Sequence, residues 1–141
     1  MLIPLRNYSN YSICESNIKI EDLVNFAEKE KLPAMALTDY KLLSGALEFS
    51  TKCKKKGIQP IIGLDFDYIS KLHHSSRLTF LSKNDIGFKN LNILSTKINT
   101  ENEFHLSLDN INNFSEGNIL ILGGLFSYFQ DLNINTCLLY T

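Results

Sequence analysis

Apolar side chains recur at helical spacing in the first part of the chain. Between residues 18 and 33 they fall three and four positions apart, at Ile20, Leu23, Val24 and Ala27, which is the pattern of an amphipathic helix. Pro33 ends this helix, because proline cannot continue the backbone hydrogen bonding. The compact apolar run that follows, residues 34–38 (AMALT), predicts a buried strand.

The alternation of helix and strand continues along the chain. A helix is predicted over residues 43–56 and a strand over residues 60–64, with room to run on to residue 69. A first strand is predicted over residues 2–6. Later strands are predicted over residues 77–81 and 118–122, and later helices over residues 85–98 and 106–111. Strands separated by helices are typical of βαβ units, so we expect an α/β fold with a mainly parallel sheet.

Composition narrows the class of protein. The chain has 141 residues, 44% of them hydrophobic, which suits one domain with its own core. A formal net charge of −1 provides no positive field, so contact with nucleic acid would be local or indirect. Cys14, Cys53 and Cys137 are far apart, as expected for reduced thiols of a cytoplasmic protein. No apolar run approaches the ~20 residues of a membrane helix, and the N-terminus lacks the features of a signal peptide.

Candidate chemistry lies where the predicted strands end, because active residues of parallel α/β folds sit there. These positions, with the start of the strand at residues 77–81, hold Arg6, Tyr8, Asp39, Tyr40, Asp65, Asp67 and Arg77. A carboxylate directly after a buried strand, as at Asp39, suits metal binding or catalysis and equally suits loop closure, so both interpretations stay open. The sequence contains no phosphate-binding glycine loop and no serine-hydrolase motif.

Several stretches of the chain resemble a known family. PLRNYSNYS (residues 4–12), PAMALTDYKLLSGALEF (residues 33–49) and GIQPIIGLDF (residues 57–66) resemble the opening of the PHP (polymerase and histidinol phosphatase) domain in bacterial DNA polymerase III alpha subunits. That opening typically reads HLHxHSxYS, PALALTDHxNLxGAxEF and GIKPIIGxE. RLTFLSKNDIGFKNL (residues 77–91) and EGNILILGG (residues 116–124) resemble later parts of the same domain.

The resemblance implies part of a distorted β/α barrel over residues 1–124, followed by a divergent C-terminal tail over residues 125–141. It also implies a metal site that is degenerate in this chain. The family's histidines are replaced at Pro4, Arg6, Tyr8, Tyr40 and Arg77, and its glutamate is replaced by Asp65. Among the ligand positions of these motifs, only Asp39 keeps the family's residue.

Metal binding at these positions is not expected. Catalytic zinc normally takes three protein ligands and a water, and hard divalent ions need several oxygens. Arg6 and Arg77 stay protonated, so each would oppose a nearby cation by about 4 kcal/mol per unit charge. We therefore expect no catalytic residue, no metal and no other cofactor. We expect instead that Arg6 and Arg77 form ion pairs with Asp39 or Asp65.

The family resemblance implies a role in DNA replication. The family is a DNA-directed DNA polymerase, a nucleotidyltransferase, but the sequence carries no polymerase domain and lacks the later PHP motifs. We therefore expect a fragment that is inactive alone and acts as scaffold and docking module. Its expected partners are the proofreading exonuclease subunit and the remainder of the alpha subunit, with nucleic acid contacted only indirectly and no membrane.

Two other functions compete with this one. The first is a metal-dependent PHP phosphoesterase or 3′–5′ exonuclease that uses Asp39 and Asp65. The second is a small regulator of the response-regulator type, which would need an acidic cluster at the first strand and a lysine at a late strand. Residues 4–7 do not supply that cluster.

Overall fold

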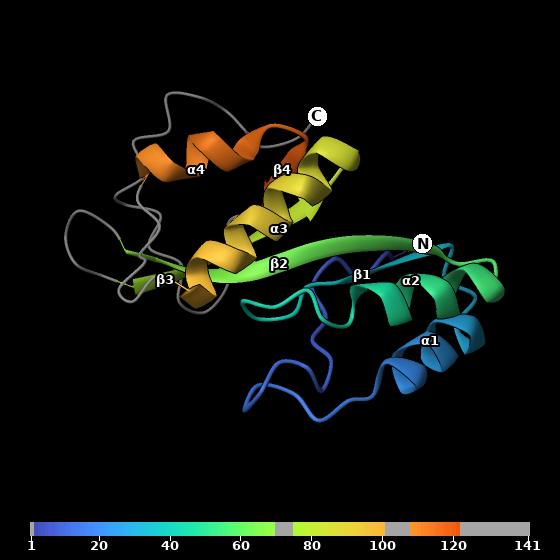
Figure 1. Cartoon of the computed structure of the whole chain (residues 1–141). Helices are drawn as coiled ribbons and strands as arrows, with labels where there is room; N and C mark the ends of the chain where they lie inside the picture. The colour runs from blue at the N-terminus through green and yellow to red at the C-terminus, as the bar shows by residue number, and fades with distance from the viewer. Residues whose placement is uncertain (1, 70–74, 101–107, 122–141) are drawn as a thin grey trace.

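The computed structural model describes residues 2–69, 75–100 and 108–121 (Figure 1). The elements in these ranges are, in chain order, α1 (Ile20–Lys29), β1 (Ala34–Leu37), α2 (Ala46–Lys55), β2 (Gln59–Ile69), β3 (Ser75–Ser82), α3 (Asp85–Thr100), α4 (Leu108–Ser115) and β4 (Asn118–Ile121). No helix of the described ranges is long and apolar enough to cross a bilayer. The tail predicted over residues 125–141 lies outside the described residues.

The four strands form one mixed sheet in the order β1-β2-β3-β4. β1 runs parallel to β2, with Leu37 opposite Ile62, whereas β2 with β3 and β3 with β4 are antiparallel. The α/β class is therefore confirmed, but a mainly parallel sheet is wrong for the described strands. The reason lies in the connection from β2 to β3: a parallel crossover needs a dozen or more residues, and β2 ends at Ile69 while β3 begins at Ser75.

The sheet is open in the part of the chain that the structure describes, since its edge strands β1 and β4 do not pair with each other. The strand predicted over residues 2–6 is not formed. An extended segment lies beside β1 in its place, because the backbone N–H groups of Ala36 and Thr38 donate to the carbonyls of Pro4 and Asn7 at 3.0 and 2.8 Å. Pro4 has no N–H to donate in return.

Two apolar clusters hold the helices to the sheet. Figure 1 shows α1 and α2 on one side of the long strand β2 and α3 and α4 on the other. The first cluster consists of Ile20, Leu23, Val24, Ala27, Met35, Leu37, Phe49, Cys53 and Ile58. The second consists of Leu64, Phe66, Tyr68, Leu78, Phe80, Leu91, Leu94, Ile111 and Phe114.

Side-chain alternation along β2 separates its apolar residues from its acidic residues. Leu64 and Phe66 enter the second apolar cluster. Because successive side chains of a strand point to opposite faces, Asp65 and Asp67 lie on the other face. The antiparallel register sets Asp65 opposite Thr79 and Asp67 opposite Arg77 on β3. The fold thereby gathers charged side chains on one face of the β2–β3 hairpin.

Candidate functional site

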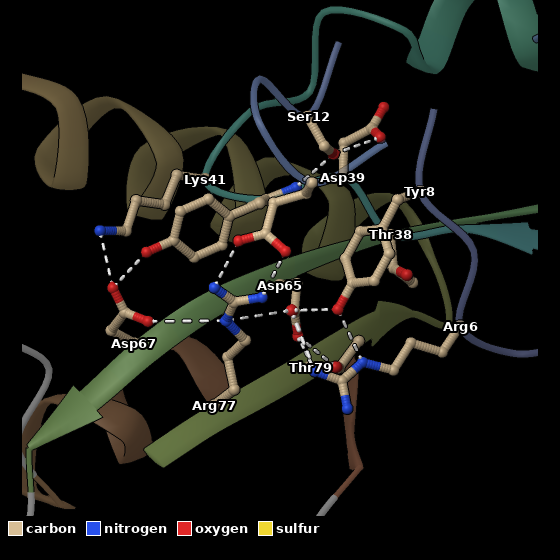
Figure 2. A network of polar contacts seen from close by, with 12 residues as sticks. Arg6, Tyr8, Ser12, Thr38, Asp39, Lys41, Asp65, Asp67, Arg77 and Thr79 are labelled. Atoms are coloured by element: carbon tan, nitrogen blue, oxygen red, sulfur yellow. Dashed lines mark hydrogen bonds and ion pairs between the residues drawn. The ribbon is translucent and has the colours of Figure 1, made fainter. Parts of the chain in front are cut away.

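The Asp65 carboxylate is the centre of the candidate site. Its side chain is completely buried, and Nη2 of Arg6 donates to both of its oxygens at 3.1 and 3.0 Å. The hydroxyls of Tyr8 and Thr79 also donate to it, each at 2.6 Å. Nε of Arg77 lies 3.9 Å from Oδ2 of Asp65, on the side away from Arg6 (Figure 2). The predicted ion pairs from both arginines are therefore confirmed at Asp65.

Arg77 connects the site to Glu15, which lies in the loop between the N-terminal extended segment and α1. Its Nη1 and Nη2 atoms donate to the two carboxylate oxygens of Glu15 at 3.0 and 2.7 Å. Its guanidinium carbon lies 4.3 Å from the centroid of the Tyr40 ring, and its Nε lies 3.8 Å from Oδ1 of Asp67. The hydrogen bonds with Glu15 raise the pKa of Arg77 and lower the pKa of Glu15.

Asp67 forms the outer part of the same network. Nζ of Lys41 lies 2.8 Å from its Oδ2, and the Tyr40 hydroxyl donates to that oxygen as well (Figure 2). Burial alone would raise the pKa of Asp67, but the hydrogen bonds from Lys41 and Tyr40 outweigh it and lower that pKa. Burial, followed by the hydrogen bond to Asp67, raises the pKa of Tyr40. Tyr40 therefore keeps its proton and acts as a donor.

Asp39 closes a loop and does not contact the arginines by any hydrogen bond or ion pair found among the described residues. Its side chain is 1% exposed. It accepts from the backbone N–H of Ser9 at 2.6 Å and from the hydroxyls of Ser9 and Ser12 at 2.7 Å each. The loop-closing interpretation of Asp39 is therefore the one that its contacts support. Asp39 is linked to the rest of the site through the backbone, since its main-chain carbonyl accepts from the N–H of Asp65 at 3.1 Å.

These residues do not fit a divalent metal ion. The oxygens of Asp65 and Asp39 already accept hydrogen bonds from protein donors. Burial and the hydrogen bond to Asp65 raise the pKa of Tyr8, which stays a neutral donor and not an anionic ligand. Within the described ranges, no group of three or more His, Cys, Asp and Glu side chains could hold a metal ion. The negative charge of Asp65 is compensated instead by the fixed positive charges of Arg6 and Arg77.

Three members of the site were not singled out from the sequence. Thr79 lies opposite Asp65 across an antiparallel pair, so finding it requires the register of β2 and β3. Lys41 has a left-handed backbone (φ 60°), and its carbonyl accepts from Ser95 and Asn99 of α3 at 2.8 Å each. Glu15 stands in a loop with no pattern that marks it. The only sequence signal among the three is that Lys41 directly follows Tyr40.

Comparison with known proteins identifies the family. The model of the PHP domain matches residues 4–135. The chain belongs to the PHP domain family. This PHP domain is 37% identical to DNA polymerase III subunit alpha of Chlamydia pneumoniae, over 92% of this chain and 12% of that protein. It is 34% identical to the same subunit of Rickettsia conorii, over 97% of this chain and 12% of that protein. The matching part is the N-terminal region of these subunits.

The PHP domain thus spans about an eighth of the length of these curated relatives. Two solved structures share its fold. An amidohydrolase from Chromobacterium violaceum superposes with a TM-score of 0.56 and 20% identity, over 67% of this chain and 32% of that one. A protein from Bifidobacterium adolescentis assigned as a metal-dependent phosphoesterase superposes with a TM-score of 0.55 and 13% identity, over 82% of this chain and 44% of that one. At these identities the likeness concerns the fold alone.

Proposed function

We propose that this PHP domain is a cytoplasmic, non-catalytic scaffold of the DNA polymerase III alpha subunit type, which docks a proofreading exonuclease subunit. The observation that carries the proposal is the ion pair between Arg6 and the buried carboxylate of Asp65. Asp65 falls on the glutamate position of the family pattern and Arg6 on a histidine position. The Arg6 guanidinium therefore contacts the Asp65 carboxylate at two positions where the family pattern has metal ligands.

Electrostatics support the absence of metal chemistry in this proposal. At an effective dielectric constant of ~20, a unit charge about 4 Å away contributes about 4 kcal/mol. A divalent ion next to Asp65 would face Arg6 at 3.0 Å and Arg77 at 3.9 Å from the carboxylate. Two carboxylates whose oxygens are already occupied would not offset that repulsion. The energetic cost of displacing both arginines makes metal occupancy unfavourable.

The same ion pairs give the domain a structural tie. Arg6 belongs to the N-terminal extended segment, Asp65 to β2 and Arg77 to β3. Removing only one partner of an ion pair with a buried carboxylate strongly destabilises the fold, whatever the net contribution of the intact pair to stability. Cross-linking of distant segments is a role that bound metal ions fill in many proteins, and here the charged side chains fill it. A rigid surface then suffices for docking and requires no reaction.

The proposal is tested with the full chain and a proofreading exonuclease subunit from the same organism. Size-exclusion chromatography should show a complex that persists in a chelator such as EDTA, because docking requires no metal.

In parallel, the chain alone is assayed with a phosphomonoester and with 3′-labelled single-stranded DNA in zinc and manganese. We expect no hydrolysis above that of an Asp65→Asn variant. Absence of a complex with folded chain would refute the docking role. Hydrolysis that disappears in Asp65→Asn would instead support the phosphoesterase or exonuclease alternative.

A further inference from the structure

We propose that the ion pair between Glu15 and Arg77 is an electrostatic latch, which holds the tip of the loop at residues 8–16 against β3 and opens while the base of the loop stays in place. This inference does not depend on the docking role, because it concerns only contacts within the chain. It rests on a contrast between the two attachments of one loop.

The loop is closed at its neck. The N–H of Asn10 donates to the carbonyl of Ile18 at 2.8 Å, and the hydroxyl of Ser16 donates to the carbonyl of Tyr8 at 3.1 Å. Compact surface loops with close ends that pack on their own side chains behave as units. The neck therefore separates the tip, residues 13–16, from the N-terminal extended segment before the loop and from α1 after it.

The base of the loop is attached in the protein interior. Ser9 and Ser12 are both 0% exposed and bind the buried Asp39. The Ser12 hydroxyl also accepts from the N–H of Tyr40 at 3.0 Å. Salt screens the interactions of solvent-exposed charges and has much less effect on buried groups. This attachment should not respond to ionic strength.

The tip is attached differently. Ile13 is 77% exposed, and Cys14 beside it is exposed with a left-handed backbone (φ 65°). Among the described contacts, the side-chain tie from the tip to the sheet is the Glu15–Arg77 pair, at 2.7 Å. Those side chains are 30% and 25% exposed, so solvent and salt reach the pair. Exposed ion pairs are weak and salt-dependent.

Two attachments of unequal strength imply two steps of opening. The Glu15–Arg77 pair breaks first, and the tip moves away from Arg77. Arg77 keeps its contacts with the Tyr40 ring and with Asp67. The buried serine contacts with Asp39 break only when the surrounding structure unfolds. Local opening of this kind is ordinary for segments with few buried contacts. Raising the ionic strength therefore increases the fraction of molecules in which the tip is released from Arg77.

The test is amide hydrogen exchange followed by NMR on the full chain in 50 mM and 1 M NaCl. The amides of Glu15 and Ser16, in the tip, donate to the carbonyl of Ser12 at the base, at 3.0 and 3.2 Å, and report the opening of the tip. The amides of Ser9 and Tyr40 report the base. In Glu15→Gln, and in wild type at 1 M NaCl, the tip amides should exchange about fivefold faster, with the base amides unchanged.

Coupling identifies the partner of Glu15. In an Arg77→Gln background, adding Glu15→Gln should cause no further acceleration, because the two variants remove the same contact. Lys56→Gln, which removes an ion pair between the end of α2 and Glu28 of α1 that touches no residue of this loop among the described contacts, is the matched control and should leave the tip amides unchanged. Equal acceleration of base and tip would overturn the two-step opening. Unchanged tip exchange in Glu15→Gln and at high salt would overturn the latch itself.

Discussion

Arg6 and Asp65 are 59 residues apart in the sequence, yet one guanidinium nitrogen of Arg6 donates to both oxygens of the Asp65 carboxylate. Asp65 is completely buried, whereas the Arg6 side chain is 29% exposed. The pair therefore joins the edge of the molecule to its interior. Since a buried carboxylate is unfavourable without partners, the stability of the domain should depend on Arg6.

Arg6→Gln tests that dependence. It removes the nearer of the two positive charges that compensate Asp65 and leaves the hydrogen bonds from Tyr8 and Thr79 in place. We expect a loss of about 3 kcal/mol in the free energy of unfolding, as for the breaking of a buried ion pair, measured by urea denaturation. Lys52→Gln, at a solvent-facing pair on α2, is the control and should not change stability measurably. Equal effects of the two variants would show that the Arg6 pair is an ordinary surface contact.

Asp39→Ala tests the closure of the loop at residues 8–16. The change leaves three buried donors of Ser9 and Ser12 without their acceptor. Each unsatisfied buried group costs about 1–3 kcal/mol, so we expect the free energy of unfolding to fall by about 3 kcal/mol or more. Thermal and urea unfolding provide the measurement. Asp39→Asn keeps the shape and one oxygen and should be milder. Full stability in Asp39→Ala would contradict a structural role for this carboxylate.

Gly87→Ala tests the contact between the start of α3 and the turn before β4. A Cβ atom at Gly87 would lie 1.9 Å from the carbonyl oxygen of Gly117, which is backbone and cannot rotate away. We expect destabilisation of about 3 kcal/mol from this overpacking, seen as a lower urea midpoint. Lys89→Ala, at an exposed position of the same helix, should have little effect. Tolerance of alanine at Gly87 would mean that the two segments are not in contact.

Acid should weaken the charged network. The pKa of Glu15 is lowered from its ordinary value of 4.5, and that of Asp67 from 3.8. Groups with a lowered pKa in the folded state contribute stability above their ordinary pKa, and this contribution is lost as the pH falls through the folded-state value. The free energy of unfolding should therefore fall as the pH drops below about 4.5. Glu15→Gln and Asp67→Asn should each flatten that dependence. A profile identical to wild type in both variants would contradict the assignment.

The sequence predicted the positions of helices and strands where apolar residues follow a clear pattern. α1 follows from the spacing of Ile20, Leu23, Val24 and Ala27, and β1 from a short apolar run ending before Asp39. Strand direction did not follow, because periodicity carries no information about pairing. The short connection between Ile69 and Ser75 was the feature that should have indicated a hairpin in place of a crossover.

The ends of the predicted strands indicated most of the site residues, and the family resemblance then indicated which of them replace metal ligands. Arg6 and Arg77 were identified because they replace expected histidines, and their charge then implied a carboxylate partner. The choice of Asp65 over Asp39 depended on hydrogen-bond partners that only the folded structure shows, since Ser9 and Ser12 already donate to Asp39. Glu15 could not be found in this way, because an ion pair between residues 62 apart leaves no local pattern.

The most direct test of the central claim is metal binding by the purified full chain. The chain is dialysed against zinc and manganese, freed of loosely bound ions, and analysed by mass spectrometry of the metals. Because guanidinium groups and hydroxyl donors occupy Asp65, we predict no stoichiometric metal in wild type and none in Asp65→Asn. Retention of one or more ions per chain in wild type, with loss of the ions in Asp65→Asn, would contradict the claim that arginine has replaced metal at this site.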